Sequence, residues 1–275
     1  MPVLHAIVLG IVQGLTEFLP ISSSGHLQLV PWLFGWDDFG GDKSLETAFD
    51  VALHMGTLVG ALAYFRRDVA GLTVGGIDWL RGRRTEQGRQ AWLLVLSAVP
   101  AAIVGVGLQS QIESNDDRIW LTAVMLIVFG LVLFAADRVL GRRTIEQFSV
   151  RDALAMGVGQ AVALQPGVSR SGVTITVARA IGFEREAATR IAFLMSLPVI
   201  AGAGLYQFID IGGPGGIPAD LRAGFIWGMV TSAVAGWVAV WGTLKLVRTS
   251  SFTPFVVYRV LAGIAVLSIL ATSFR

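Results

Sequence analysis

Two short polar loops, each set in apolar sequence, hold the residues best suited to chemistry in this chain. In the first, Gln13 and Glu17 lie four residues apart, and therefore on one helix face, ahead of three serines and His26. The second loop is centred on Arg170. A carboxylate, a hydroxyl, an imidazole and a guanidinium together suit phosphoryl transfer, because they offer a metal ligand, a nucleophile, an acid or base, and a phosphate ligand. The candidate catalytic residues are therefore Glu17, one of the serines, His26 and Arg170.

Hydroxyl and amide side chains around these residues are candidates for substrate binding. Helix N-termini and hydroxyl groups bind anions, so we expect the two loops to hold phosphate oxygens. For any one serine the alternative is a helix cap, and for Arg170 it is neutralisation of Glu17 alone. The candidate phosphate-binding residues are Gln13, Ser22, Ser24, Ser169, Ser171 and Thr174.

A divalent cation is the expected cofactor. Glu17 and Gln13 offer oxygen atoms, which Mg²⁺ or Ca²⁺ prefers, and the chain has no cysteine to bind a softer metal. A second tier of candidates is the pair Asp50 and His54, which are also four residues apart. Solvation near a membrane surface explains that pair about as well as a functional role does.

The two polar loops belong to an internal repeat. When the chain is displaced by 147 residues, the segment 10–25 aligns with 157–172 without a gap, and five of its sixteen positions are identical. The identical pairs are Gly10/Gly157, Gln13/Gln160, Ser22/Ser169, Ser24/Ser171 and Gly25/Gly172. Such a repeat predicts two structurally related halves with one polar loop in each.

The composition indicates a polytopic membrane protein that forms a single domain. Of 275 residues, 54% are hydrophobic and 15% charged, whereas soluble domains are about 25% charged. Six apolar stretches are long enough to span a bilayer, at about residues 45–65, 91–109, 119–137, 187–209, 223–246 and 254–272. Two more, at about 3–36 and 153–181, are broken in the middle by the polar loops.

The broken stretches predict re-entrant hairpins, because a non-helical break exposed to lipid would leave backbone groups without partners. We therefore expect an all-α fold with six full spans and four half-helices. One repeat covers about 1–140 and the other about 150–275. Each repeat has one hairpin and three spans, and three is odd, so the second repeat starts on the opposite side of the membrane and the topology is inverted.

Loop charges predict the orientation. The loops at 65–91 and 137–153, and the one before Pro254, are rich in arginine or lysine and should be cytoplasmic. The alternate loops are acidic and should face outward; one of them carries Glu113, Asp116 and Asp117. This arrangement places both termini outside, opens the first hairpin outward and the second to the cytoplasm, and brings the two polar loops together near mid-membrane.

Two motifs carry a family resemblance. The segment QGLTEFLP-ISSSGH at 13–26 and PGVSRSGVT at 166–174, with SFTPF at 251–255 and Tyr258-Arg259, resemble the bacterial undecaprenyl-pyrophosphate phosphatase family of the BacA/UppP type over essentially the whole chain. The resemblance implies hydrolysis of undecaprenyl pyrophosphate to undecaprenyl phosphate and phosphate, with a divalent cation and an active site reached from outside. The product is the lipid carrier of cell-wall synthesis.

The resemblance also implies roles for individual residues. Glu17 and Gln13 would serve the metal and the pyrophosphate, Ser23 and His26 the reaction itself, and Arg170 the phosphates. Family members with Glu in place of Gln13 have a second carboxylate, so Gln13 is expected to bind through its carbonyl oxygen or to position water. Whether Ser23, His26 or water is the nucleophile stays open.

The alternative function is a polyprenyl-phosphate transporter or flippase, because inverted repeats with broken helices are also a transporter arrangement. The clustered Glu17, Ser23, His26 and Arg170 favour the enzyme, since anion transport does not need the full set. The expected partners are the lipid substrate and the bilayer of the bacterial inner membrane, and no nucleic acid. A homodimer is left open.

Overall fold

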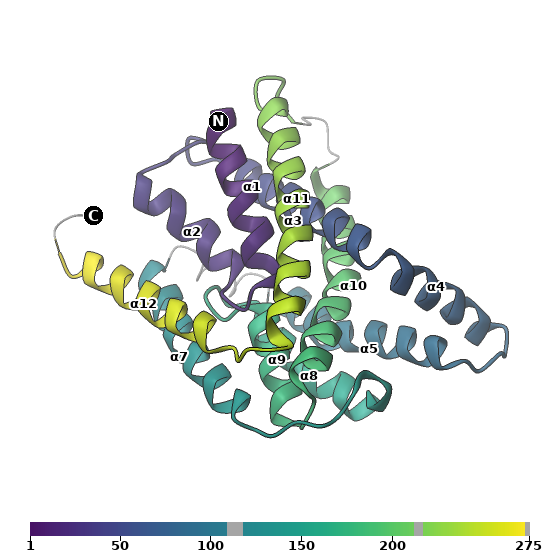
Figure 1. Cartoon of the computed structure of the whole chain (residues 1–275). Coiled ribbons are helices and arrows are strands. Elements are labelled where there is room, and N and C mark those ends of the chain that lie inside the picture. Colours follow the sequence, from purple (N-terminus) through teal and green to yellow (C-terminus); the bar gives the residue numbers. More distant parts are fainter. Residues whose placement is uncertain (109–117, 212–216, 273–275) are drawn as a thin grey trace.

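The structure is a computed structural model that describes residues 1–108, 118–211 and 217–272, with side chains at 207–211 excepted (Figure 1). All regular elements in these residues are helices. Glu113, Asp116 and Asp117, which the sequence assigns to an outer loop, lie outside the described residues. The helices are α1 (Val3–Phe18), α2 (Ser23–Phe34), α3 (Lys43–Tyr64), α4 (Arg66–Leu80), α5 (Glu86–Gly107), α7 (Ile119–Asp137), the 3₁₀ turn η1 (Ile145–Gln147), α8 (Val150–Val162), α9 (Arg170–Ala180), α10 (Arg185–Ile211), α11 (Arg222–Val247) and α12 (Thr253–Leu270).

Five of the described helices are long and apolar enough to cross a membrane, namely α5, α7, α10, α11 and α12. A sixth candidate is α3 together with α4, which are bent by 87° at Phe65. The five helices correspond to five of the six spans expected from the sequence, and the remaining one, at 45–65, falls on α3. Both broken stretches are helix pairs, α1 with α2 and α8 with α9, as the polar loops predicted.

The arginine-rich segment 65–91 differs from the loop expected there. Most of it is α4, and α5 already begins at Glu86. The physical reason is that Val69 and Leu72, spaced three residues apart, pack against the central hydrophobic core while α4 lies along α5. Of its six arginines, two lie on α4 and one on α5, while the other three lie between the two helices.

Glycines allow the helices around the polar loops to approach closely. A Cβ on Gly10 would lie 2.4 Å from the carbonyl oxygen of Gly228 in α11, so α1 and α11 meet backbone to backbone. The repeat partner of Gly10 behaves in the same way, since a Cβ on Gly157 would lie 2.5 Å from the carbonyl oxygen of Ser97 in α5. Helix α1 thus packs on α11 as α8 packs on α5.

The two polar loops meet at the centre of the molecule. Ser22 Oγ accepts a hydrogen bond of 3.1 Å from the backbone N–H of Gly167, and Ser171 Oγ donates one of 3.1 Å to the carbonyl of Leu19. The sequence-based expectation that the loops come together is confirmed by these contacts. Residues about 145 positions apart in the chain therefore share one site.

Candidate active site

Glu17, in the last turn of α1, is the centre of a cluster of hydrogen-bond donors. Its side chain is only 2% exposed. Oε2 accepts from Gln13 Nε2 at 3.0 Å and from Ser23 Oγ at 2.7 Å, while Oε1 accepts from the Arg170 guanidinium. His54 Nε2 lies 3.4 Å from Oε2. A buried carboxylate is costly without partners, and the hydrogen bonds from Gln13, Ser23 and Arg170 supply them.

The same local structure in both loops presents two of those partners. Ser22 caps α2 and Ser169 caps α9, each through its Oγ accepting from the backbone N–H three residues on. Both caps have a positive φ, 79° and 75°, which non-glycine residues seldom adopt. The residue after each cap begins the helix: Ser23 in one loop and Arg170 in the other. These repeat-related positions differ in residue type, yet both reach the carboxylate of Glu17.

Strain at the two caps has a structural consequence. A positive φ at a serine costs free energy and persists only where the surroundings fix it. Ser22 and Ser169 are nearly fully buried, and their hydroxyls are held by backbone N–H groups. After this turn, the first residues of α2 and α9, Ser23 and Arg170, both contact the carboxylate of Glu17. Two positive helix ends therefore flank Glu17.

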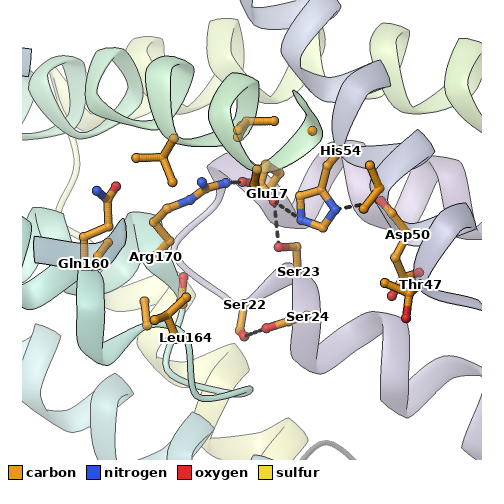
Figure 2. A pocket seen from close by; sticks show the side chains of 18 residues that line it. Glu17, Ser22, Ser23, Ser24, Thr47, Asp50, His54, Gln160, Leu164 and Arg170 are labelled. Carbon is orange, nitrogen blue, oxygen red and sulfur yellow. Dashed lines mark hydrogen bonds and ion pairs between the residues drawn. The ribbon is translucent and has the colours of Figure 1, made fainter. Parts of the chain in front are cut away.

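A cavity of about 390 Å³ opens beside Glu17 (Figure 2). In Figure 2, Glu17 lies between Arg170 on one side and His54 on the other, with Ser23 beneath it. Helices α3, α5, α8 and α10 supply the rest of the lining, which includes apolar residues such as Val199 and Ile200. The cavity therefore combines a charged end with an apolar wall.

The structure brings most of the predicted site residues to this cavity and leaves others outside its lining. Those that line it are Glu17, Ser22, Ser23, Ser24, Ser169, Arg170, Asp50 and His54. Gln13 is fully buried and hydrogen bonded to Glu17, and it does not line the cavity. Ser171 bonds to the first loop, and the hydroxyl of Thr174 bonds to backbone carbonyls of its own helix, so neither contributes to the lining.

The two candidate histidines lie in different places. The Nδ1 of His26 donates to the carbonyl of Ser22 at 2.6 Å, which leaves Nε2 of the neutral ring to accept from the Tyr258 hydroxyl at 2.7 Å. His26 is buried and does not line the cavity. His54 Nδ1 donates to the carbonyl of Asp50 at 2.7 Å, and its Nε2 faces Glu17. Proton transfer by His26 stays a prediction, and the imidazole at the cavity is His54.

Arg259, in α12, is a site residue whose role the sequence did not reveal. Its side chain is fully buried, and its guanidinium donates to the carbonyls of Pro20 at 3.2 Å, Gly167 at 2.8 Å and Val168 at 3.0 Å. It also donates to Leu126 in α7 at 3.0 Å. Arg259 thereby links the two polar loops through their backbone carbonyls. Its neighbour in sequence, Tyr258, holds His26.

The fold and the site define a helical membrane protein in which a carboxylate, an arginine and a serine meet, and comparison with known proteins identifies its family. The family described as bacitracin resistance protein BacA matches residues 6–265. The chain belongs to that family, and it is a multi-pass membrane protein.

Relatives with assigned activities are similar over nearly their full length. A protein of Geobacter sulfurreducens is 47% identical over 98% of this chain and 99% of its own length. One from Desulforudis audaxviator is 46% identical over 96% and 97%, and one from a Nocardioides species is 44% identical over 98% and 97%. Each of the three is named undecaprenyl-diphosphatase.

Proposed function

We propose that this chain hydrolyses undecaprenyl diphosphate to undecaprenyl phosphate and inorganic phosphate, and so recycles the lipid carrier of cell-wall synthesis. The observation that carries the proposal is the joint contact of Ser23 and Arg170 with Glu17, in a cavity flanked by two helix N-termini. These contacts support roles for Ser23 as nucleophile, Glu17 as proton acceptor and Arg170 as phosphate ligand. The relatives named undecaprenyl-diphosphatase supply the substrate.

The proposed first step is attack on the terminal phosphorus by Ser23 Oγ. The hydroxyl already donates to Glu17 Oε2, so the carboxylate is placed to take the proton as the new P–O bond forms. The bond to the bridging oxygen breaks, and undecaprenyl phosphate leaves with the electron pair. Water then attacks the phosphoserine, the P–O bond to Ser23 breaks, the proton held by Glu17 returns to Oγ, and both protons of the water leave with the product as dihydrogen phosphate.

Arg170 changes partner in this scheme. Without substrate it neutralises Glu17; with a diphosphate in the cavity its guanidinium can turn to the phosphate oxygens while Glu17 gains a proton from Ser23. The negative charge beside Arg170 thus moves from the carboxylate to the phosphate group, and the guanidinium follows it. The unpaired N–H groups at the start of α2 and α9 stabilise the same oxygens.

We also propose that His26 positions the first loop. Both of its ring nitrogens are hydrogen bonded, one of them to the carbonyl of the strained Ser22. This arrangement fixes the ring against Tyr258 and holds the cap of α2, on which Ser23 depends. Loss of His26 would then lower activity through the loop geometry, with no need for the imidazole to touch the substrate.

A divalent cation, Mg²⁺ or Ca²⁺, is part of the proposal. Gln13 Oε1 is buried without a hydrogen-bond partner, and Gln13 adjoins Glu17, so an amide oxygen and a carboxylate fit a hard cation. Within the described residues no cluster of three acidic or histidine side chains could hold a metal, so the remaining ligands would be diphosphate oxygens and water. When bound, the cation would neutralise charge on the diphosphate.

We infer that the two halves are inverted repeats, with both termini outside and the cavity open to the outer side. The matched strained caps and the equivalent packing of Gly10 and Gly157 support this arrangement. The arginines of α4 and of the segment before α8 support a cytoplasmic location for those segments. Cysteines introduced singly at the two ends of α11 should then be labelled from opposite sides of intact cells.

Phosphate release by purified protein in detergent tests the proposed function. Wild type should release phosphate from undecaprenyl diphosphate, and excess EDTA should abolish that release until Mg²⁺ or Ca²⁺ is restored. Glu17→Ala is the matched control, since it removes the centre of the cluster. Folded wild-type protein that releases no phosphate would overturn the enzyme and leave transport of a polyprenyl phosphate as the function to measure in vesicles.

A further inference from the structure

An apolar groove of about 590 Å³ lies against the candidate active site. It is formed by α3, α10 and α11, and its lining includes Ala52, Met55, Ala201, Leu205 and Met229. Apart from Arg222, the residues that line it are uncharged and non-polar. Some of them are well exposed at the molecular surface; Leu205, for example, is 65% exposed.

The groove is continuous with the site cavity. Val51 of α3 and Gly204 of α10 line both of them. At this junction α10 lacks a side chain, and a Cβ on Gly204 would lie 2.3 Å from Met55 Sδ. A larger residue at position 204 would therefore displace Met55 and narrow the passage. The polar cavity thus has an apolar exit between α3 and α10.

A second apolar groove, by contrast, is not continuous with the site cavity. It has a volume of about 310 Å³, lies between α4, α5 and α10, and is lined by residues such as Leu72, Leu80 and Ala91. None of its lining residues lines the site cavity. The first groove is therefore joined to the cavity through shared lining residues, and the second is not.

We propose that the groove of α3, α10 and α11 binds the polyprenyl tail of the substrate, and that the first isoprene units leave the cavity over Gly204. The inference rests on the proposed function, because the diphosphate head must occupy the cavity for its tail to follow this path. Head and tail are joined covalently, so the tail would follow the apolar groove that shares lining residues with the cavity. Burial of the isoprene carbons there then contributes to affinity.

Filling the groove tests the inference. Ala201→Phe places a ring among the lining residues of the groove, and Ala91→Phe makes the same change in the second groove. Initial rates of phosphate release from undecaprenyl diphosphate give KM and kcat for each variant. We expect Ala201→Phe to raise KM roughly tenfold, as for the loss of about two buried methylene groups, with kcat within about twofold of wild type. Ala91→Phe should leave both unchanged.

A second variant, Leu205→Trp, keeps the test decisive if Ala201→Phe does not fold, because residue 205 is mostly exposed. Thermal unfolding in detergent reports folding for each variant. An unchanged KM in a folded groove variant would mean that the groove holds only bilayer lipid, and would overturn the inference. So would an equal rise in KM for Ala91→Phe. If the wild type releases no phosphate, the proposed function itself is refuted, and this outcome differs from one in which the wild type is active and the groove variants keep its KM.

Discussion

The strained cap Ser22 should contribute more to stability than its repeat partner Ser169. Both hydroxyls accept a hydrogen bond from the backbone N–H three residues on, at 3.3 Å and 3.1 Å. Ser22 Oγ also accepts from the buried N–H of Gly167 in the other loop. Replacement by alanine therefore removes a cap at either position, but at position 22 it also leaves a buried N–H without its partner.

The expected magnitudes follow from those bonds. Loss of a cap costs about 1 kcal/mol, and an unsatisfied buried N–H costs roughly 1–3 kcal/mol more. Ser169→Ala should thus cost about 1 kcal/mol and Ser22→Ala about 2–4 kcal/mol. Glycine at position 22 loses the same bonds but accepts the positive φ of 79° without strain. It should therefore recover about 1 kcal/mol relative to alanine.

Thermal unfolding of the purified variants in detergent measures the order of their stabilities. One kcal/mol corresponds to roughly 2–4 °C in Tm for a chain of this size. Ser22→Ala should unfold below Ser22→Gly, and Ser169→Ala should stay closest to wild type. Equal Tm values for Ser22→Ala and Ser169→Ala would refute a stabilising bond between the loops. A glycine variant less stable than the alanine variant would refute strain at the cap.

Three further substitutions test the chemistry. Ser23→Ala should lower phosphate release by at least about a thousandfold if Oγ is the nucleophile, and a phosphoserine trapped by acid quench in wild type should be absent from the variant; near-normal turnover would exclude the covalent route. Arg170→Lys should retain under about a tenth of wild-type turnover, because an ammonium cannot bind two phosphate oxygens in the planar geometry of a guanidinium; full activity would show that charge alone suffices. Arg259→Met should lower turnover at least about tenfold, as expected when catalytic groups lose their alignment, whereas Arg248→Met, at an exposed ion pair with Glu186, should not; equal activities would remove the positioning role of Arg259.

The sequence predicted the frame of the site because its signals are local or periodic. The repeat around Ser22 and Ser169 predicted two related halves with one polar loop in each. The apolar stretches foretold helices, and the odd number of spans in each repeat foretold that the loops would meet. Together these signals predicted that Glu17 and Arg170 lie in one site.

The parts that the sequence could not give depend on distant packing. His26 follows the serines directly, yet Tyr258, 232 residues away, fixes its ring outside the cavity lining. His54 faces Glu17 because α3 packs against α1, which no local pattern announces. Helix α4 was expected as part of a loop because arginines stand at both ends of the segment, while the apolar side chains that pack on the core lie between them. Tertiary contacts settled each of these cases.

The attachment of both polar loops to Arg259 has a consequence for biosynthesis. Arg259 lies on α12, which the ribosome makes after every other helix described here. Until α12 inserts, the carbonyls of Pro20, Gly167 and Val168 lack the guanidinium that gathers them. A nascent chain that already contains Glu17, Ser23 and Arg170 would therefore have its reactive groups without their alignment. Hydrolytic competence would arrive with the last helix, so that truncated or stalled chains would not consume the lipid diphosphate pool.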